Sequence, residues 1–107
     1  MAASPESLSE ALRRLSAKGF SHGLRASHRS LRDLVTGDAY APELLSIDEV
    51  VRFEGESDPD EQATLFAVRS PGGRPLGTYV VVYGAGMPPD DADVVHRLAH
   101  PERIGSP

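Results

Sequence analysis

Residues 70–74, Ser-Pro-Gly-Gly-Arg, are the sequence feature that most constrains the fold. A proline followed by two glycines favours a tight reversal of the chain. The segments on either side, residues 64–69 and 76–83, have strand patterns, so the three segments together predict a β-hairpin. The second strand is apolar on both faces, which is typical of a central strand with a covering layer on each side.

A third strand is predicted just before the hairpin. Residues 47–54 alternate in polarity, with Ile47, Val51 and Phe53 on one face, as in a half-buried strand. We therefore expect a three-stranded antiparallel core over residues 47–83.

A helix is predicted over residues 6–19. Ser7 and Glu10 have the spacing of a capping box, and Gly19 supplies a left-handed stop. Four apolar residues share the i, i+3, i+4, i+7 spacing of one helix face: Leu8, Ala11, Leu12 and Leu15.

A shorter helix is expected over residues 90–99. Asp91 and Asp93 would lie in its first turn, where the helix dipole favours carboxylates. We expect residues 101–107 to form a flexible tail. In the middle of the chain, Pro42 is expected to begin a single helical turn.

The segment between the first helix and the core, residues 22–35, allows two interpretations. Leu24 and Ala26 alternate as in a strand, although the leucines of this segment would also line a helix. Glycine and several serines weaken a helix. We therefore expect a strand over residues 22–28 that resumes near 31–35.

The order of these elements predicts one α+β domain over residues 1–107. It would contain an N-terminal helix, a three- to four-stranded antiparallel sheet and a short C-terminal helix. The first helix can cover one sheet face. The other face needs the short C-terminal helix or a partner chain, and the small size of that helix makes a homodimer or protein partner a possible arrangement.

Charge is unevenly distributed along the chain, whose net charge is −5. Residues 1–36 hold six basic and three acidic side chains, whereas the remainder holds five and thirteen. We expect the two halves to pair in the fold, with a polyanion site in the first half as the alternative. An acidic chain without tryptophan or a basic aromatic pattern is not expected to bind nucleic acid.

Several functional classes lack support in the sequence. Cysteine is absent, which excludes disulfides, thiolate metal sites and cysteine nucleophiles. No secretory leader and no apolar run of about 20 residues occurs, so we expect a cytoplasmic protein without a membrane segment. Neither a phosphate-binding glycine loop nor a GxSxG motif is present, and we expect no cofactor.

Five carboxylates lie in the segment 54–61, Glu-Gly-Glu-Ser-Asp-Pro-Asp-Glu. Glu56, Asp58 and Asp60 are candidate ligands of a divalent cation, because Mg²⁺ keeps most of its waters and needs only one or two carboxylates. The spacing does not fit an EF-hand, which has glycine where this segment has Pro59. A solvated turn explains the same residues, and we favour that interpretation.

The four histidines give weak signals for a metal site. His96 and His100 have the helical spacing of half a zinc site, but the proline after His100 disfavours helix there. His22 and His28 would lie about 20 Å apart on a straight strand, too far to share one ion. We expect structural or surface roles for all four.

Arginines and tyrosines are the candidate ligand-binding residues. Arg25 and Arg29 would share one strand face, where guanidinium groups could hold the phosphate or carboxylate of a small anionic ligand. A solvated face that pairs with the acidic half explains the same residues, and we favour that interpretation. Tyr79 and Tyr83 would form a flat binding surface, although packing in a central strand explains them equally well.

Residues 52–60, RFEGESDPD, and the later Gly77 and Tyr83 resemble a segment and a strand shared by short uncharacterised bacterial proteins. Those proteins carry the patterns RFEGxSxPDD and KGxLxxxYG, and some are labelled phosphoribosylpyrophosphate synthetase. The resemblance implies a recurring small domain centred on residues 52–55 without an assigned activity. It adds Arg52 and Glu54 to the candidate ligand-binding residues.

Two functional hypotheses follow. The first is a non-enzymatic binding or protein-interaction domain, dimeric or partner-binding, that uses the sheet face around Tyr79 and Tyr83 or the acidic segment. The second is an enzyme or sensor for a phosphorylated or anionic small molecule, with Arg25, Arg29 and Arg52 as binders and Glu54 or a neighbouring carboxylate as metal ligand or base. A cleft that gathers these arginines would favour the second hypothesis.

Overall fold

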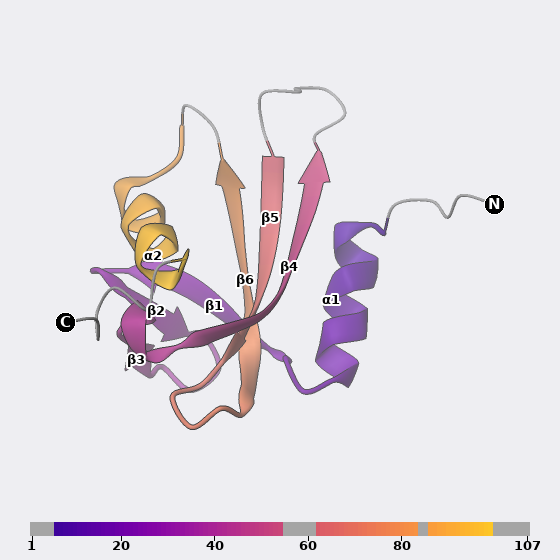
Figure 1. Cartoon of the computed structure of the whole chain (residues 1–107), viewed down its shortest axis with the longest axis horizontal. Coiled ribbons are helices and arrows are strands. Elements are labelled where there is room, and N and C mark those ends of the chain that lie inside the picture. Colours follow the sequence, from indigo (N-terminus) through magenta and orange to yellow (C-terminus); the bar gives the residue numbers. More distant parts are fainter. Residues whose placement is uncertain (1–5, 55–61, 84–85, 100–107) are drawn as a thin grey trace.

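The computed structural model describes residues 6–54, 62–83 and 86–99 (Figure 1). These residues form two α-helices and a six-stranded mixed sheet, which confirms the α+β class. The predicted sheet of three to four antiparallel strands was wrong, because the segment after the first helix adds three strands and one of them pairs in parallel. In chain order the elements are α1 (Leu8–Ala17), β1 (His22–Ser27), β2 (Ser30–Asp33), β3 (Ala39–Tyr40), the 3₁₀ helix η1 (Pro42–Leu44), β4 (Ser46–Glu54), β5 (Gln62–Arg69), β6 (Pro75–Tyr83) and α2 (Pro89–Ala99).

The predicted three-stranded core is present as β4, β5 and β6, which pair antiparallel in sequence order. The hairpin turn closes where the amide of Ser70 donates to the carbonyl of Arg74 at 2.8 Å. Gly73 lies inside this turn at a φ of 87°, a conformation that glycine adopts without steric cost. The turn sequence therefore determined this part of the sheet locally.

The uncertain segment 22–35 forms a second hairpin rather than a helix. Its strands β1 and β2 meet at Ser27 and Ser30, and His28 and Arg29 form the turn at φ values of 51° and 67°. The strand expected from about residue 22 to 28 is present as β1, and its expected resumption near residues 31–35 is present as β2. The turn was missed because it contains none of the glycine or asparagine pairs that usually mark two-residue hairpins.

The sheet contains two hairpin units, β1–β2 and β5–β6. They join through a short parallel pairing between β1 and β6. Three residue pairs make this joint, beginning with His22 and Gly77 and ending with Leu24 and Tyr79. The strand order is consequently β3-β2-β1-β6-β5-β4, with β1 and β6 in the middle. At the joint the backbones approach so closely that a Cβ atom on Gly77 would lie 2.0 Å from the carbonyl oxygen of His22.

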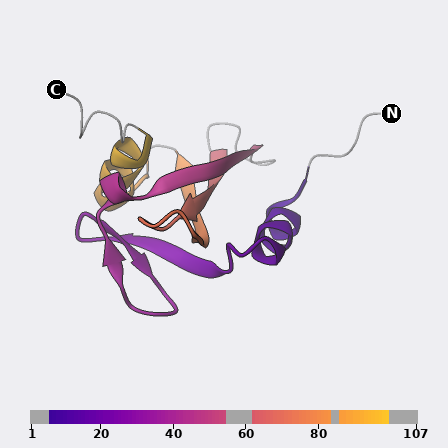
Figure 2. The ribbon, with the colours of Figure 1, turned by 60° about the horizontal axis from the view of Figure 1, so that its bottom comes forward.

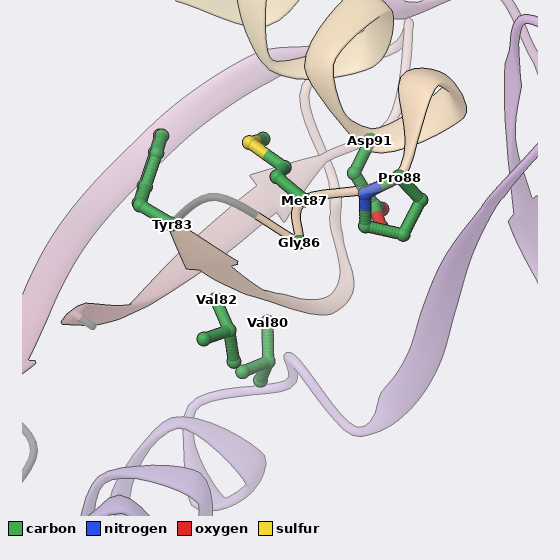
Figure 3. Close-up of a pocket in the computed structure, with 7 residues that line it drawn as sticks. All are labelled: Val80, Val82, Tyr83, Gly86, Met87, Pro88 and Asp91. Atoms are coloured by element: carbon green, nitrogen blue, oxygen red, sulfur yellow. The ribbon is translucent and has the colours of Figure 1, made fainter. Parts of the chain in front are cut away.

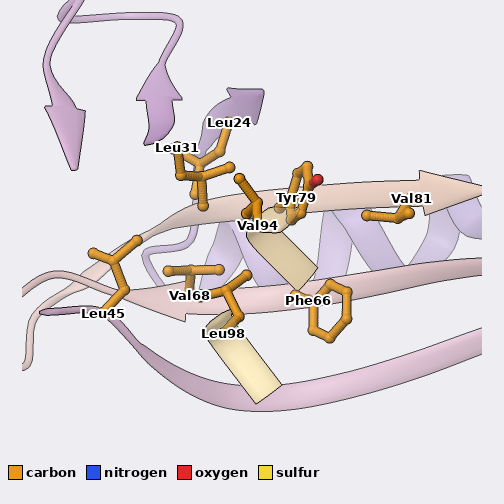
Figure 4. Close-up of a cluster of buried hydrophobic side chains, with 9 residues drawn as sticks. All are labelled: Leu24, Leu31, Leu45, Phe66, Val68, Tyr79, Val81, Val94 and Leu98. Atoms are coloured by element: carbon orange, nitrogen blue, oxygen red, sulfur yellow. The ribbon is translucent and has the colours of Figure 1, made fainter. Parts of the chain in front are cut away.

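The helices pack on opposite faces of the sheet, at opposite sides of the molecule in both views (Figures 1 and 2). The α1 face is the one on which α1 packs, and α1 contacts β4 and β5 there. Its buried cluster consists of Ala11, Leu15, Phe20, Leu65 and Ala67. The α2 face carries the larger cluster, shown in Figure 4: Leu24, Leu31, Leu45, Phe66, Val68, Tyr79, Val81, Val94 and Leu98.

Arginine side chains fasten each helix to the sheet. Arg14 of α1 donates to both carboxylate oxygens of Glu49 on β4, at 2.7 and 3.0 Å. Arg97 of α2 binds Glu43 of η1, and it also donates to the carbonyl oxygen of Arg29 in the β1–β2 turn at 2.6 Å. The expected pairing between the basic and acidic halves of the chain therefore occurs at Arg14.

Candidate functional site

The C-terminal end of β6 extends beyond its pairing with β1. The pairing with β1 ends at Tyr79, whereas residues 80–83 continue and pair only with β5. Backbone groups of a strand point alternately to its two sides. In the described part of the chain, the side of residues 80–83 that faces away from β5 therefore has no strand partner. An edge of this kind is a template for another extended segment.

A pocket of about 340 Å³ lies beside this free edge (Figure 3). Val80 and Val82 line it from one side of the β6 ribbon, and Tyr83, Met87 and Pro88 line it from the other. The two valines are 37% and 50% exposed, so apolar surface is open to solvent here. The volume is at the lower end of the range for ligand pockets, which suits a side chain better than a cofactor.

Asp91 is the acidic residue of this pocket, and it lies in the first turn of α2. The hydroxyl of Tyr79 donates to its carboxylate at 2.5 Å. Burial and then the hydrogen bond to Asp91 raise the pKa of Tyr79, so this hydroxyl stays a neutral donor. Since Tyr79 is only 1% exposed, it holds the carboxylate in a fixed position. Asp91 forms no ion pair within the described residues.

The structure brings together three of the predicted ligand-binding residues. Tyr79 and Tyr83 lie on the α2 face, and Arg52 shares that face because it pairs with Thr64 two positions from Phe66. Burial raises the pKa of Tyr83, and the nearby Arg52 guanidinium opposes that shift. The side chain of the fourth candidate on this part of the sheet, Glu54, lies outside the described atoms.

Arg25 and Arg29 are not part of this group, and the prediction that they share a strand face was wrong. Arg25 lies on the α1 face, because its neighbours Leu24 and Ala26 point to the α2 face. Arg29 is in the β1–β2 turn, where its guanidinium lies 3.8 Å from Asp93. The turn at residues 28 and 29 interrupts the strand alternation on which the prediction depended.

The proposed metal ligands Glu56, Asp58 and Asp60 lie outside the described residues. Within the described ranges, no group of three or more histidine, aspartate or glutamate side chains is placed to hold a metal ion. His22 has a structural role instead, because its Nδ1 lies 2.7 Å from a carboxylate oxygen of the buried Asp33.

Sequence reasoning missed the role of Asp91 in the pocket. It assigned this residue only to the favourable end of the helix dipole, and that position was correct. The contact joins a strand to a helix twelve positions further along the chain, a separation that no local sequence pattern encodes. The one available signal was a tyrosine in a central strand, because a buried tyrosine hydroxyl needs a partner.

No protein-family model, curated protein or solved structure matches this chain. The resemblance to short bacterial proteins with the RFEGxSxPDD pattern therefore stays a prediction. In the part of the chain that the structure describes, neither helix has the length and apolar character needed to cross a membrane.

Proposed function

We propose that this protein is a non-enzymatic interaction domain that binds an extended, basic segment of a partner protein at the free end of β6. The observation that carries the proposal is the pocket beside residues 80–83, in which Asp91 is the one carboxylate among the described lining residues and forms no ion pair with them. The partner segment would add to the sheet as a further strand and place one basic side chain in the pocket.

The backbone of β6 supplies the first part of the recognition. Strand addition to an exposed sheet edge gains affinity from main-chain hydrogen bonds, and pockets for alternate side chains give specificity. Residues 80–83 offer this edge, and the β5 pairing on the other side holds them in an extended conformation. A partner strand would therefore meet a preformed template, which lowers the entropic cost of binding.

The pocket supplies the second part. Its walls at Val80, Val82, Met87 and Pro88 are apolar, and the charged group is Asp91. A lysine or arginine side chain matches this arrangement, because its methylene groups pack on apolar walls while its charged end reaches a carboxylate. The net charge of −5 would also favour the approach of a basic segment.

The positions of the arginines favour binding over anion chemistry at this site. A cleft for a phosphorylated substrate would gather Arg25, Arg29 and Arg52. In the structure Arg25 and Arg52 lie on opposite faces of the sheet, and Arg29 lies in a turn beside Asp93. Among the described residues that line the pocket, none is an arginine or a lysine.

The test is an NMR titration of the ¹⁵N-labelled protein with the blocked pentapeptide acetyl-Val-Lys-Val-Lys-Val-amide. We expect saturable shifts of the amides of residues 80–83 and of Asp91. The Asp91→Asn variant should bind at least about tenfold more weakly, because a charge-assisted hydrogen bond is worth about 1.5–3 kcal/mol. Asp90→Asn is the matched control, since Asp90 is a neighbouring exposed carboxylate that does not line the pocket.

Two further arms separate the alternatives. The same peptide with glutamate in place of lysine should not bind. If n-butylammonium alone produces the full response, the site takes a small organic cation and the interaction proposal fails. Equal peptide affinity for the Asp91→Asn and Asp90→Asn variants would also overturn it, as would the lack of any saturable response to the lysine peptide.

A further inference from the structure

Arg25 on β1 and Arg32 on β2 lie directly opposite each other in the hairpin. Directly opposed residues share a sheet face, with Cβ atoms about 4.5–5.5 Å apart. Both arginines are exposed on the α1 face. Like charges in this position destabilise a hairpin, so the arrangement has a cost that needs an explanation.

Three other arginines each bind a carboxylate closely. Arg14 and Arg97 bind glutamates, and Arg69 binds Asp48 at 2.8 Å. Arg25 and Arg32, by contrast, form no side-chain hydrogen bond or ion pair within the described residues. The only acidic residue of the two strands is Asp33, and it is buried and bonded to His22.

The surroundings leave the two guanidinium groups accessible. On this face α1 packs on β4 and β5 and also contacts β6, while Arg25 and Arg32 remain exposed to solvent. The next row along the hairpin contains Gly23, which has no side chain, and Leu34, which is 58% exposed. A ligand can therefore approach both arginines from solvent.

We propose that Arg25 and Arg32 form a binding site for an oxyanion, a phosphoryl or carboxylate group held between the two guanidinium groups. Arginine donors match the geometry of both groups and bind them through paired hydrogen bonds. In the free protein the two side chains repel each other, and a bound anion cancels this repulsion. Relief of the repulsion therefore contributes to the affinity for the anion. The site lies on the α1 face, whereas Arg52 lies on the α2 face.

Two anions serve as probes, inorganic pyrophosphate and citrate, and the arginine Nε–H signals are followed by NMR. We expect saturable shifts at both arginines, and stronger binding of pyrophosphate than of citrate would identify a phosphoryl site. Arg25→Gln and Arg32→Gln should each weaken binding about tenfold. Arg74→Gln is the control, because Arg74 is an exposed arginine of the β5–β6 turn without an ion pair in the described structure.

The Arg32→Glu variant gives a second readout that does not depend on the ligand. Opposite charges across the hairpin should raise the melting temperature in anion-free buffer and abolish the response to both probes. The proposal is overturned if neither anion gives a saturable shift, or if Arg74→Gln weakens binding as much as Arg25→Gln. A melting temperature for Arg32→Glu at or below that of the unmodified protein would likewise refute the claimed repulsion.

Discussion

Replacing Gly77 by alanine should disrupt the joint between the two halves of the sheet. The added Cβ atom would lie 2.0 Å from the carbonyl oxygen of His22 and 2.8 Å from its carbonyl carbon. Cβ atoms essentially never approach another atom closer than 3.0 Å, so β1 or β6 must move by about 1 Å. A shift of that size takes the hydrogen bonds of the parallel pairing beyond their usual length.

The magnitude follows from the size of this joint. Three residue pairs connect β1 to β6, and the loss of about three hydrogen bonds at about 1 kcal/mol each would cost about 3 kcal/mol. For a domain of this size, that loss corresponds to a fall in melting temperature of about 12–24 °C. Urea unfolding followed by circular dichroism measures the free energy directly.

Gly72→Ala is the matched control for this experiment. The nearest atom to a Cβ at Gly72 is the hydroxyl oxygen of Ser70 at 4.0 Å, so we expect little change in stability. A Gly77→Ala variant within about 1 kcal/mol of the unmodified protein would refute the argument that this joint depends on close backbone approach.

Two other changes test the β1–β2 hairpin. Arg29→Gly should raise the free energy of unfolding by up to about 1 kcal/mol, because Arg29 has a φ of 67° and its ion pair is exposed; an unchanged or lower value in urea unfolding would contradict this. Asp33→Asn should destabilise the protein at neutral pH, and its free energy of unfolding should fall less steeply as the pH is lowered into the acid range. Burial alone would raise the pKa of Asp33, but hydrogen bonds from His22, Val35 and Thr36 outweigh burial and lower the pKa. The ionised carboxylate therefore stabilises the fold above its ordinary pKa, and this stabilisation is lost as the pH falls through the lowered pKa. Parallel pH profiles for this variant and the unmodified protein would show that Asp33 has no such effect.

Elements encoded by neighbouring residues could be predicted from the sequence. The capping box of Ser7 and Glu10 is present, and the turn at residues 70–74 joins β5 to β6. Proline begins both η1 and α2, where its missing amide donor has no cost. In each case the physical cause lies within a few positions along the chain.

The parallel pairing of β1 with β6 could not be predicted in this way. The two strands are far apart along the chain, and no residue in either strand indicates which strand it pairs with. Gly77 was a signal, since glycine inside a strand often marks close backbone approach. The candidate site shows the same limit, because Tyr79 was identified from its strand whereas its partner Asp91 depends on where α2 packs.

The β1–β6 pairing also has a consequence for the order of folding. Its first pair, His22 and Gly77, closes a loop of 55 positions, whereas Arg69 and Pro75 of the neighbouring hairpin are six apart. Loop-closure entropy makes the longer contact about 2 kcal/mol more costly to form. The two hairpin units should therefore form early, and their association through β1 and β6 should limit the folding rate. Synthesis of β6 is thus the step at which the growing chain first gains a complete sheet.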